Sequence, residues 1–192
     1  MVTELDYHII RVRGLVTRFG AHTVHDGLDL DVRRGEIIGI VGGSGTGKSV
    51  LLRAIVGLLQ PQAGKIEVFG ESVRDTGVDA YRDLRRRWGV MFQDGALFSS
   101  LTVRQNVEAP MREQLDLPDA LRETLAGIKV RMVGLPEDAM DKFPSELSGG
   151  MRKRAGFARA IALDPAIVFL DEPTAGLDPV GAAAFDTLIK QL

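Results

Sequence analysis

The sequence predicts an α/β protein, and three features lead to that prediction. Residues 37–41 are almost all apolar, a glycine-rich loop follows them, and residues 50–59 have the pattern of a buried helix. A second apolar segment, residues 166–170, ends in two carboxylates. The first third of the chain carries strand and turn signals, with period-two alternation at residues 28–32. An apolar strand, a loop and a helix in this order are typical of a parallel sheet covered by helices, here preceded by antiparallel strands.

The remaining elements follow from the same patterns. Residues 9–16 mix β-branched and polar side chains as a strand does, and residues 34–36 form a turn before the central buried strand expected at 37–41. From about residue 95 to 145, prolines interrupt a helical periodicity, which indicates a mostly helical insert. The further elements that we expect are strands at 65–69, 89–93 and 166–170 and helices at 50–59, 79–87, 151–163 and 182–192.

The composition excludes several kinds of protein. The 192 residues include no cysteine, which excludes a disulfide framework, a cysteine-ligated metal and a thiol nucleophile. The net charge of −2 provides no global field for nucleic acid or anionic lipid. The longest apolar run, residues 166–170, is far shorter than the ~20 residues of a membrane-spanning helix, and the N-terminus lacks the apolar region of a signal peptide. We therefore expect an intracellular soluble protein.

A phosphate-binding loop is the strongest single motif. The pattern G-x-x-x-x-G-K-[ST] is matched by Gly42, Gly43, Ser44, Gly45, Thr46, Gly47, Lys48 and Ser49, and no residue directly after Ser49 is claimed for the site. Glycines let the backbone turn its N–H groups toward phosphate oxygens, and the following helix adds its positive N-terminal end. Lys48 can reach the β- and γ-phosphates, and Ser49 offers a hydroxyl to Mg²⁺. The alternative is a glycine-rich turn that binds nothing, and the strand and helix expected around the loop argue against it.

Asp171 and Glu172 directly follow the apolar strand expected at 166–170. In proteins that hydrolyse nucleotides with a phosphate loop, an Asp at a strand end helps to hold Mg²⁺, and Asp171 fits that role. Glu172 could polarise a water for attack on the γ-phosphate. Two solvated acids in a turn before Pro173 are the alternative, which would be preferred if the chain had no phosphate loop.

A third motif lies between these two. Leu147, Ser148, Gly149, Gly150 and Met151 precede a basic helix start at residues 152–154. A hydroxyl, bare backbone N–H groups and a helix N-terminus can receive a second anion, although Ser148 could equally be a simple N-cap. The order of the three motifs resembles the ATP-binding-cassette (ABC) ATPases, whose signature motif is LSGGQ-like. The resemblance covers essentially the whole chain.

This resemblance implies a P-loop NTPase fold with a RecA-like core, an N-terminal antiparallel β-subdomain and an inserted helical subdomain. It divides one ABC ATPase domain into residues 1–94, with the β-subdomain and the first part of the core, 95–147, the helical subdomain, and 148–192, the return to the core. We expect this last part to be incomplete.

The resemblance also places three further residues at the ATP site. Phe19 matches the aromatic residue that stacks on adenine, although ordinary packing would also explain it. Gln93 matches the Q-loop glutamine that contacts Mg²⁺ or the attacking water and senses the membrane partner. Asp178 matches the D-loop, which crosses to the other subunit. The catalytic residues that the resemblance implies are Glu172, Lys48 and Gln93, and the Mg²⁺ ligands are Ser49, Gln93 and Asp171.

The partners and the mechanism also follow from the resemblance. In this family the signature motif of one subunit closes over the γ-phosphate held by the other, so we expect a head-to-tail homodimer with two ATPs at its interface. Hydrolysis removes the shared ligand and loosens the dimer, which moves an attached integral membrane permease. We therefore expect a peripheral protein at the cytoplasmic face of the inner membrane, with ATP and Mg²⁺ as cofactors and no nucleic acid partner.

A finer resemblance concerns the transported substrate. Residues 92–110 and the Met151 variant of the signature, followed by a basic run, look like the ATPases of Mla/Mce-type phospholipid transporters. This resemblance implies transport of phospholipid or another lipid, with an Mce-domain lipid-binding protein as a possible further partner. Leu97 and Phe98 are candidates for docking the permease, or they pack within the helical subdomain. The basic run at residues 85–87 is better explained as a solvated helix face than as a lipid site.

Other function classes stay open at this point. An ABC ATPase for another small molecule would share every motif. A soluble ABC ATPase acting on nucleic acid or ribosomes usually carries tandem cassettes or long coiled coils, which this chain lacks. A non-hydrolysing regulatory cassette is disfavoured, because the phosphate loop, Asp171 and Glu172 are all intact.

The distribution of histidine bears on this last alternative. The three histidines are His8, His22 and His25, and residues 26–192 contain none. ABC ATPases generally place a switch histidine one strand beyond the D-loop, about 30 residues past the position of Asp171. The chain ends at Leu192, before that position. We therefore expect a C-terminally truncated cassette that is less stable and hydrolyses ATP weakly, while it still binds ATP.

Overall fold

The computed structural model describes residues 8–74 and 77–191 and divides the chain into two compact units. The first unit ends at Arg85 and the second begins at Arg86, and each is described by itself. No helix within the described part of the chain has both the length and the apolar composition to span a membrane.

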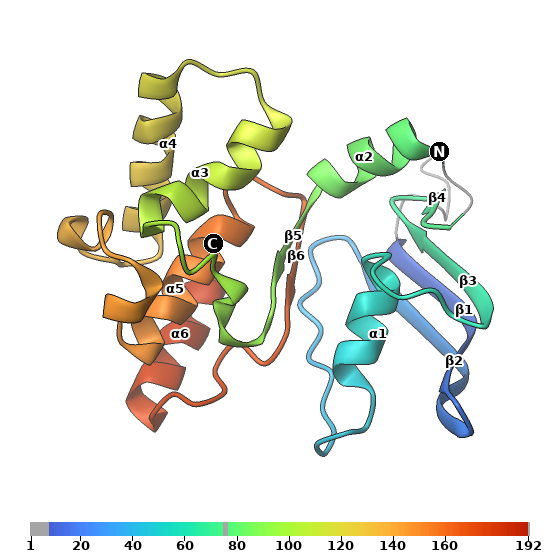
Figure 1. Cartoon of the computed structure of the whole chain (residues 1–192). Coiled ribbons are helices and arrows are strands. Elements are labelled where there is room, and N and C mark those ends of the chain that lie inside the picture. The colour runs from blue at the N-terminus through green and yellow to red at the C-terminus, as the bar shows by residue number, and fades with distance from the viewer. Residues whose placement is uncertain (1–7, 75–76, 192) are drawn as a thin grey trace. The chain divides into compact units, whose positions relative to one another are not determined.

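A four-stranded antiparallel sheet forms most of the first unit (Figure 1). Its strands are β1 (His8–Phe19), β2 (His22–Arg33), β3 (Ala63–Val68) and β4 (Glu71–Ser72), in the order β2-β1-β3-β4. Ile10 and Val12 are buried on one face of β1, while Arg13 on the other face donates to Asp31 of β2 at 2.8 Å. The alternation expected of a half-exposed sheet is therefore present, and the predicted antiparallel β-subdomain is confirmed.

Two helices complete the first unit. Helix α1 (Lys48–Ile55) lies along one face of the sheet and buries Leu51, Ala54 and Ile55 (Figure 1). It is shorter than the predicted helix at 50–59, because Gly57 adopts φ 73° and its N–H donates to the carbonyl of Ala54, which ends the helix. Helix α2 (Val78–Arg86) lies where residues 79–87 predicted it, and the Tyr81 hydroxyl donates to the Val56 carbonyl at 3.1 Å.

The predicted central buried strand at residues 37–41 is wrong for this structure. These residues belong to no strand, and Val41 is 96% exposed. An apolar run indicates burial, but a strand also needs hydrogen-bonded neighbours. Within the first unit, β1 takes β2 and β3 as its two neighbours, so residues 37–41 lie outside the sheet.

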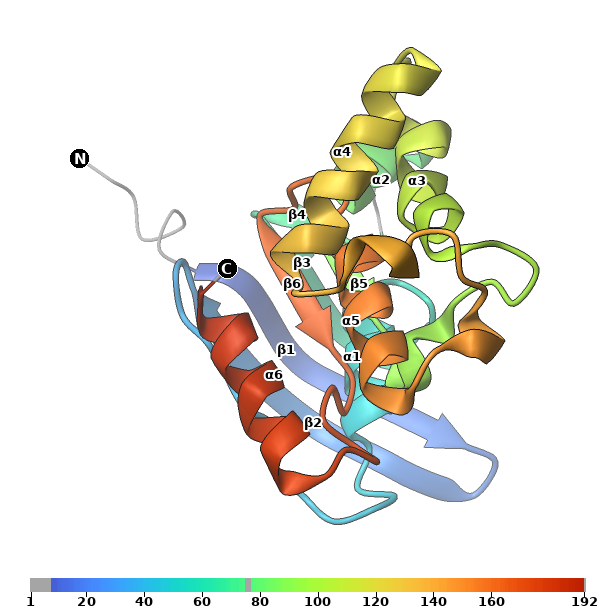
Figure 2. The ribbon, with the colours of Figure 1, turned by 90° about the vertical axis from the view of Figure 1, so that its left-hand side faces the viewer.

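The second unit contains a parallel strand pair whose two strands are separated in the sequence by several helices (Figure 2). Strands β5 (Trp88–Met91) and β6 (Ile167–Leu170) pair in parallel, and the Trp88 ring meets the Phe169 ring edge-on at 6.2 Å. The helices are α3 (Val103–Gln114), α4 (Asp119–Met132), α5 (Gly149–Ala160) and α6 (Pro179–Gln191), with 3-10 turns η2 (Gln93–Ala96), η3 (Glu137–Ala139) and η4 (Pro144–Glu146). The predicted helical insert and the strands around it are confirmed.

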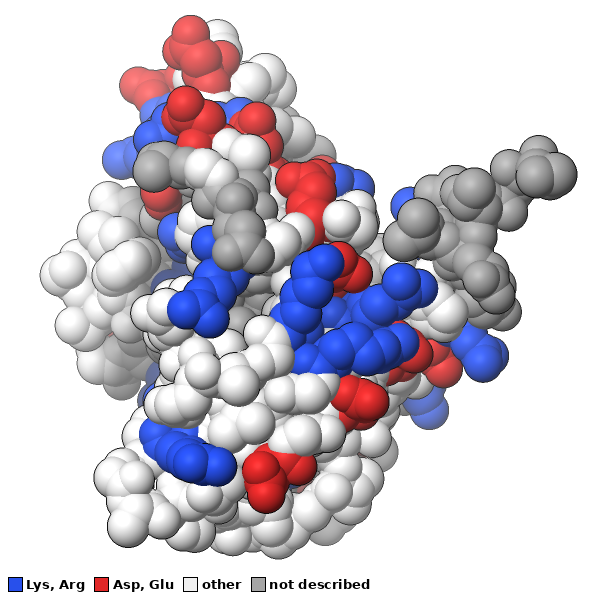
Figure 3. Space-filling model, turned by 90° about the vertical axis from the view of Figure 1, so that its right-hand side faces the viewer, with Lys and Arg blue, Asp and Glu red and all other residues white. Residues whose placement is uncertain are grey.

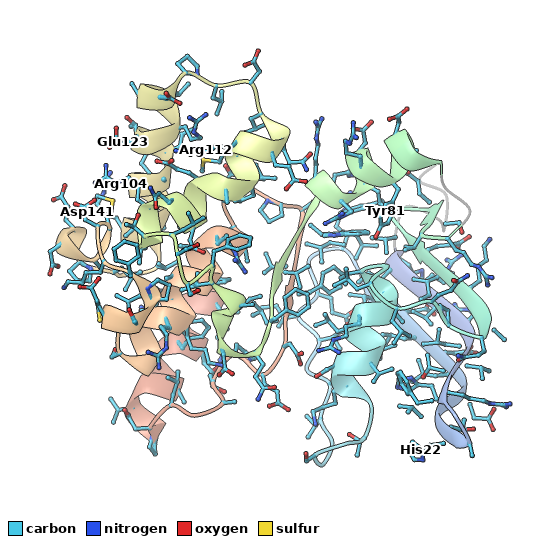
Figure 4. The ribbon with its side chains drawn as sticks, in the orientation of Figure 1. His22, Tyr81, Arg104, Arg112, Glu123 and Asp141 are labelled. Atoms are coloured by element: carbon cyan, nitrogen blue, oxygen red, sulfur yellow. The ribbon has the colours of Figure 1, made fainter. Side chains whose placement is uncertain are left out.

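One apolar core joins these helices to the strand pair. It includes Met91 of β5, Val107 of α3, Val130 of α4 and Phe157 of α5, and the Phe157 ring packs against Phe185 of α6 at 5.6 Å. Ion pairs add to this packing at the surface. Figure 4 shows Arg104 of α3 close to Glu123 of α4 and to Asp141, and it forms ion pairs with both.

Charged side chains of both signs share the surface of the first unit, as Figure 3 shows. Ion pairs such as Lys65 with Glu67 account for part of this arrangement. Arg85, Arg86 and Arg87 are all exposed, and the Arg85 guanidinium lies 5.8 Å from the centre of the Tyr81 ring. The preferred interpretation of this run as a solvated face agrees with that exposure.

Candidate functional site

The phosphate loop has a backbone that only glycine adopts easily. Gly45 and Gly47 have φ of 80° and 96°, in the left-handed region. A Cβ on Gly47 would lie 2.5 Å from Val24 and 2.8 Å from the His25 ring, so strand β2 leaves no room for a side chain there. A Cβ on Gly42 would lie 2.7 Å from the Thr46 hydroxyl. The loop therefore needs its glycines both for conformation and for space.

Lys48 is the first residue of α1, with Gly47 as the N-cap. Its ammonium donates to the carbonyls of Gly42 and Gly43, both at 2.8 Å, and the Thr46 hydroxyl donates to the Gly43 carbonyl at 2.9 Å. These bonds hold the lysine charge within the loop. The first turn of α1 contains no acidic residue, so its positive N-terminal end is not neutralised there. Loop, ammonium and helix end together favour an anion.

The set of candidate phosphate-binding residues ends at Ser49, in the first turn of α1. The next position is a valine, Val50, which is no part of the site. This side chain is half-buried and has no hydroxyl to offer to a phosphate or to Mg²⁺. Ser49 is therefore the last residue of the motif with a side-chain oxygen.

A buried histidine of β2 packs against this loop. His25 of β2 is 7% exposed, and its Nδ1 lies 2.7 Å from the Thr17 hydroxyl of β1. Burial lowers the pKa of His25 below its usual value, which favours the neutral ring. Because the ring lies against Gly47, His25 and Thr17 tie the loop to the sheet.

Phe19 ends β1 in the same unit, next to the turn that leads into β2. It pairs with His22 across the hairpin and is 51% exposed. The ring is therefore not an ordinary core residue, and part of it is open to solvent.

The two strand-end carboxylates lie in the second unit, where β6 ends. The Asp171 N–H donates to the Met91 carbonyl at 2.9 Å, which extends the β5–β6 ladder by one step, and the residue is 6% exposed. Glu172 is exposed and has φ 46°, a left-handed backbone conformation that is uncommon for a residue with a side chain. The ladder thus ends with one carboxylate residue buried and the next exposed.

Gln93 begins turn η2, is separated from the end of β5 by Phe92, and is exposed. The three residues after it, 94–96, all have positive φ, so the chain coils tightly here. Gly95 fits against α5 only because Gly156 is opposite: a Cβ on Gly156 would lie 2.6 Å from the Gly95 Cα. The Arg159 guanidinium donates to the carbonyls of Gly95 and Ala96, at 3.1 and 2.8 Å. Helix α5 therefore holds the turn that carries Gln93.

Asn106 fixes the segment after this turn. The side chain is fully buried, accepts the Phe98 N–H at 2.8 Å, and donates to the carbonyls of Phe98, Leu101 and Thr102 at 3.0–3.1 Å. Phe98 itself is 54% exposed, with Arg159 lying 5.5 Å from its ring centre. Leu97 is half-buried against the core of the second unit. The two candidate docking residues thus differ, because Phe98 is exposed and Leu97 packs.

The LSGGM segment forms the N-terminus of α5. Leu147 is buried, and the Ser148 hydroxyl accepts the Met151 N–H at 3.2 Å, so Ser148 is the N-cap that the alternative interpretation proposed. Ser148 and Gly149 are nevertheless exposed, and the cap leaves them accessible at a helix N-terminus. Gly150 lies near Leu177, since a Cβ there would lie 3.8 Å from its side chain.

Asp178 has a structural role in this chain. It precedes α6, and its carboxylate accepts the Gly181 N–H at 2.8 Å, while its carbonyl accepts the Ala182 N–H. It is therefore the N-cap of α6, and it is also exposed.

The predicted site residues fall into two groups. Phe19 and the loop through Ser49 lie in the first unit, while Gln93, Asp171, Glu172, the LSGGM segment and Asp178 lie in the second. Four residues that support these segments were not predicted from the sequence. His25 lies against Gly47 and Lys153 donates to Glu172, while Arg159 bonds to the turn after Gln93 and Asn106 to the segment that carries Phe98. Lys153 could have been found, because it shares a helix face with Phe157 and Ala160, and a lysine on an apolar face needs a partner.

Comparison with known proteins identifies the family. The model of a family described as ABC transporter matches residues 25–175. The chain is 42% identical over 183 residues to a "Probable ribonucleotide transport ATP-binding protein mkl" of Mycobacterium leprae, with 95% of this chain and 52% of the relative aligned. It is 40% identical to the "Intermembrane phospholipid transport system ATP-binding protein MlaF" of Haemophilus influenzae, with 98% of this chain and 71% of that protein covered. The chain thus spans about half the length of the mycobacterial relative.

Solved structures agree with this assignment. The ATP-binding cassette MJ0796, in a dimeric post-hydrolysis state bound to ADP and Pi, matches with a TM-score of 0.87 at 29% identity over 95% of this chain and 82% of that chain. The cbiO1 protein of Clostridium perfringens, part of an ABC transporter complex, matches with a TM-score of 0.83 at 31% identity over 97% of this chain and 74% of that chain. The predicted P-loop ATPase fold is confirmed, and the chain belongs to the ABC transporter family.

Proposed function

We propose that this chain binds and hydrolyses ATP as the nucleotide-binding part of an ABC transporter. The observation that carries the proposal is the phosphate loop, where Gly47 turns the backbone against β2 and the Lys48 ammonium is held within the loop. Such a loop at the N-terminus of α1 favours a polyphosphate over a neutral ligand, because backbone dipole and lysine charge act on the same group.

In this proposal Lys48 contacts the β- and γ-phosphates, and the N–H groups of residues 42–49 contact the other phosphate oxygens. Phe19 stacks on the adenine ring. Its exposure supports the assignment, since a stacking ring must offer an open face.

The donors that would hold Mg²⁺ are the Ser49 hydroxyl, the Asp171 carboxylate and the Gln93 amide oxygen. Mg²⁺ takes hard oxygen ligands, and it is usually held by one or two carboxylates together with water and phosphate oxygens. Among the residues that the structure describes, no group of three His, Cys, Asp or Glu is arranged to hold a metal. When bound, Mg²⁺ would neutralise phosphate charge.

Glu172 is the proposed base that orients or deprotonates the attacking water. Its exposure at the end of β6, beside buried Asp171, supports that role. Ser148 and Gly149 are exposed at the N-terminus of α5, as a motif that receives the γ-phosphate held by a second copy of the chain must be. We propose a head-to-tail homodimer in which Asp178 lies near the interface.

Phospholipid is the cargo that we propose. The names of the relatives differ, one indicating ribonucleotide transport and another phospholipid transport, and the similarity of residues 92–110 and Met151 to Mla/Mce-type ATPases favours the second. An integral membrane permease would dock on exposed Phe98, with an Mce-domain lipid-binding protein as a further component. In this arrangement the chain lies at the cytoplasmic face of the inner membrane.

The test is a transport assay with the permease complex in phospholipid vesicles. We expect ATP-dependent movement of a fluorescent phospholipid between the vesicles and a lipid acceptor, and its loss in Lys48→Ala. ATP-dependent uptake of a radiolabelled ribonucleotide, without phospholipid movement, would instead favour the other cargo. ATP hydrolysis by a complex that moves neither would leave the ATPase assignment standing and remove the lipid assignment.

A further inference from the structure

Three basic residues follow the LSGGM segment, and each donates to a backbone carbonyl of a different segment. Arg152 donates to Leu147 at 2.7 Å, Lys153 to Glu172 at 3.0 Å and Arg154 to Val133 at 2.6 Å. All three side chains are therefore engaged within the fold, although Arg152 is exposed and Arg154 is half-buried. Only Lys153 is buried, at 3% exposure, and only its bond reaches a strand-end carboxylate residue.

Burial of an ammonium group is unfavourable unless the charge is solvated by protein groups. Lys153 lies on the apolar face of α5 that also carries Phe157 and Ala160. A leucine or methionine would fill such a position at lower cost. This position instead holds a charged donor, which bonds to a single carbonyl, that of Glu172. We take this as an indication that the position of the Glu172 carbonyl is important for the protein.

The backbone conformation of Glu172 needs to be stabilised by other residues. The residue has φ 46°, and it is followed by Pro173, whose ring disfavours helical backbone conformations in the residue before it. A left-handed residue before proline is therefore strained, and it persists only where its surroundings hold it. Two donors meet the Glu172 carbonyl: the Lys153 ammonium at 3.0 Å and the Ala175 N–H at 3.1 Å.

The residue before Glu172 is held as well, because the Asp171 N–H donates to the Met91 carbonyl of β5. With both ends fixed, the direction in which the Glu172 side chain leaves the backbone is fixed too. The Ala175 bond is local, within a turn of four residues, whereas the Lys153 bond ties this turn to helix α5.

We infer that Lys153 is a positioning residue, which sets the direction of the Glu172 carboxylate by holding its strained backbone. The inference rests on the proposed function of Glu172 as the base in ATP hydrolysis. Lys153 itself does not touch the nucleotide in this account, so its removal affects turnover and not ATP affinity.

The test compares Lys153→Met and Lys153→Arg in the complete ATPase with its permease. Methionine has similar length without a donor, and the Glu172 carbonyl keeps its bond from Ala175, so we expect the variant to fold. We expect kcat of Lys153→Met to fall between about 10-fold and about 100-fold, as for misplaced catalytic groups. The Kd for ATP stays within about twofold, and Lys153→Arg recovers most of the rate because it keeps a donor.

Arg154→Met is the matched control. It also loses a bond from α5 to a carbonyl, that of Val133, which lies away from the carboxylates. We expect a rate per folded protein close to that of the wild type. A second measurement uses Glu172→Gln as background: if Lys153 acts through Glu172, adding Lys153→Met there lowers the residual rate no further.

Clear outcomes would overturn the inference. Wild-type turnover in Lys153→Met, a loss of ATP affinity equal to the loss of rate, or a full further loss in the Glu172→Gln background each contradicts it. If Lys153→Met does not fold, Lys153→Gln replaces it. Its donor is one bond shorter, so kcat should fall at least about 3-fold, and an unchanged kcat would contradict the inference. A wild-type complex without ATPase activity would instead contradict the proposed function.

Discussion

The phosphate loop and the carboxylate end of β6 are built in different ways. The loop is shaped mostly by its own residues: its glycines turn the chain, and Lys48 and Thr46 bond to carbonyls of the same loop. The carboxylate end is shaped by contacts from elsewhere. Met91 holds Asp171, and Lys153, 19 residues before Glu172, holds the Glu172 carbonyl.

The phosphate loop and the carboxylate end of β6 should therefore differ in their tolerance of amino-acid substitutions. A loop made by local backbone geometry depends mainly on its glycines and on the β2 side chains packed against Gly47, so substitutions farther away should leave its shape intact. A residue held by a distant helix depends on the packing of that helix, so changes along α5 should reach Glu172. Substitutions in each region therefore test this contrast.

Glu172→Gln separates cleavage from binding. We expect the ATPase rate to fall about 10²-fold to 10⁴-fold, because a neutral amide cannot accept the proton of the attacking water. ATP binding should remain, since the loop that we propose binds the phosphates lies in the other unit. Steady-state turnover and equilibrium binding of a fluorescent ATP analogue measure the two effects. Lys48→Ala should instead lose ATP affinity. Retained affinity in this variant would contradict the contrast between the two regions.

Gly47→Ala tests the local construction of the loop. The new Cβ would lie 2.5 Å from Val24, and φ 96° is strained for any other residue. We expect a loss of about 3 kcal/mol in unfolding free energy together with weaker ATP binding. Urea unfolding and nucleotide titration measure both. Gly43→Ala is the stability control, since its Cβ would find only an ordinary contact at 3.9 Å with Thr46; equal destabilisation by the two would refute the geometric argument.

Asn106→Ala tests the long-range construction of the second unit. The substitution leaves the Phe98 N–H and the carbonyls of Leu101 and Thr102 without this partner, at an expected loss of about 2 kcal/mol. The segment that carries Phe98 should also exchange its amide hydrogens faster. Glu113→Ala, at an exposed position of the same helix, should change neither quantity. Unchanged exchange at Phe98 in Asn106→Ala would show that this anchor is dispensable.

His25 gives the smallest effect, and it concerns pH. Burial lowers the pKa of His25 in the folded protein, so the unfolded chain takes up the proton more readily. The contribution to stability is therefore present above the unfolded pKa of about 6.5 and is lost as the pH falls below it, with a slope of no more than about 1.4 kcal/mol per pH unit.

Urea unfolding between pH 5 and pH 8 measures this slope, and His25→Leu should reduce it. The control is the same substitution, His22→Leu, at the exposed histidine in the turn of the β1–β2 hairpin (Figure 4). An identical pH dependence in the wild type and in His25→Leu would mean that another group is responsible.

Most of the elements could be predicted because their signals are local. Glycine and proline positions, period-two alternation in β2 and helical spacing in α3, α4 and α5 each act over a few residues. The errors are of two kinds. Helix α1 ends earlier than its apolar run suggested, because Gly57 ends it, and residues 37–41 form no strand here despite their apolar sequence. Pairing in a sheet depends on other strands, about which the run itself contains no information.

The same distinction separates the parts of the candidate site. Lys48 in the phosphate loop and Glu172 after an apolar strand are readable in the chain from residue types and spacing. Gln93 and the function of the LSGGM segment are implied only by the resemblance to the ABC ATPases. The partners of the residues that hold them in place could not be read. Helical spacing places Lys153 on an apolar face, but tertiary structure alone decides that its ammonium meets the Glu172 carbonyl and that Asn106 bonds to four backbone groups. A motif is a property of neighbouring residues, whereas a buried donor acquires its role from the carbonyl that folding brings to it.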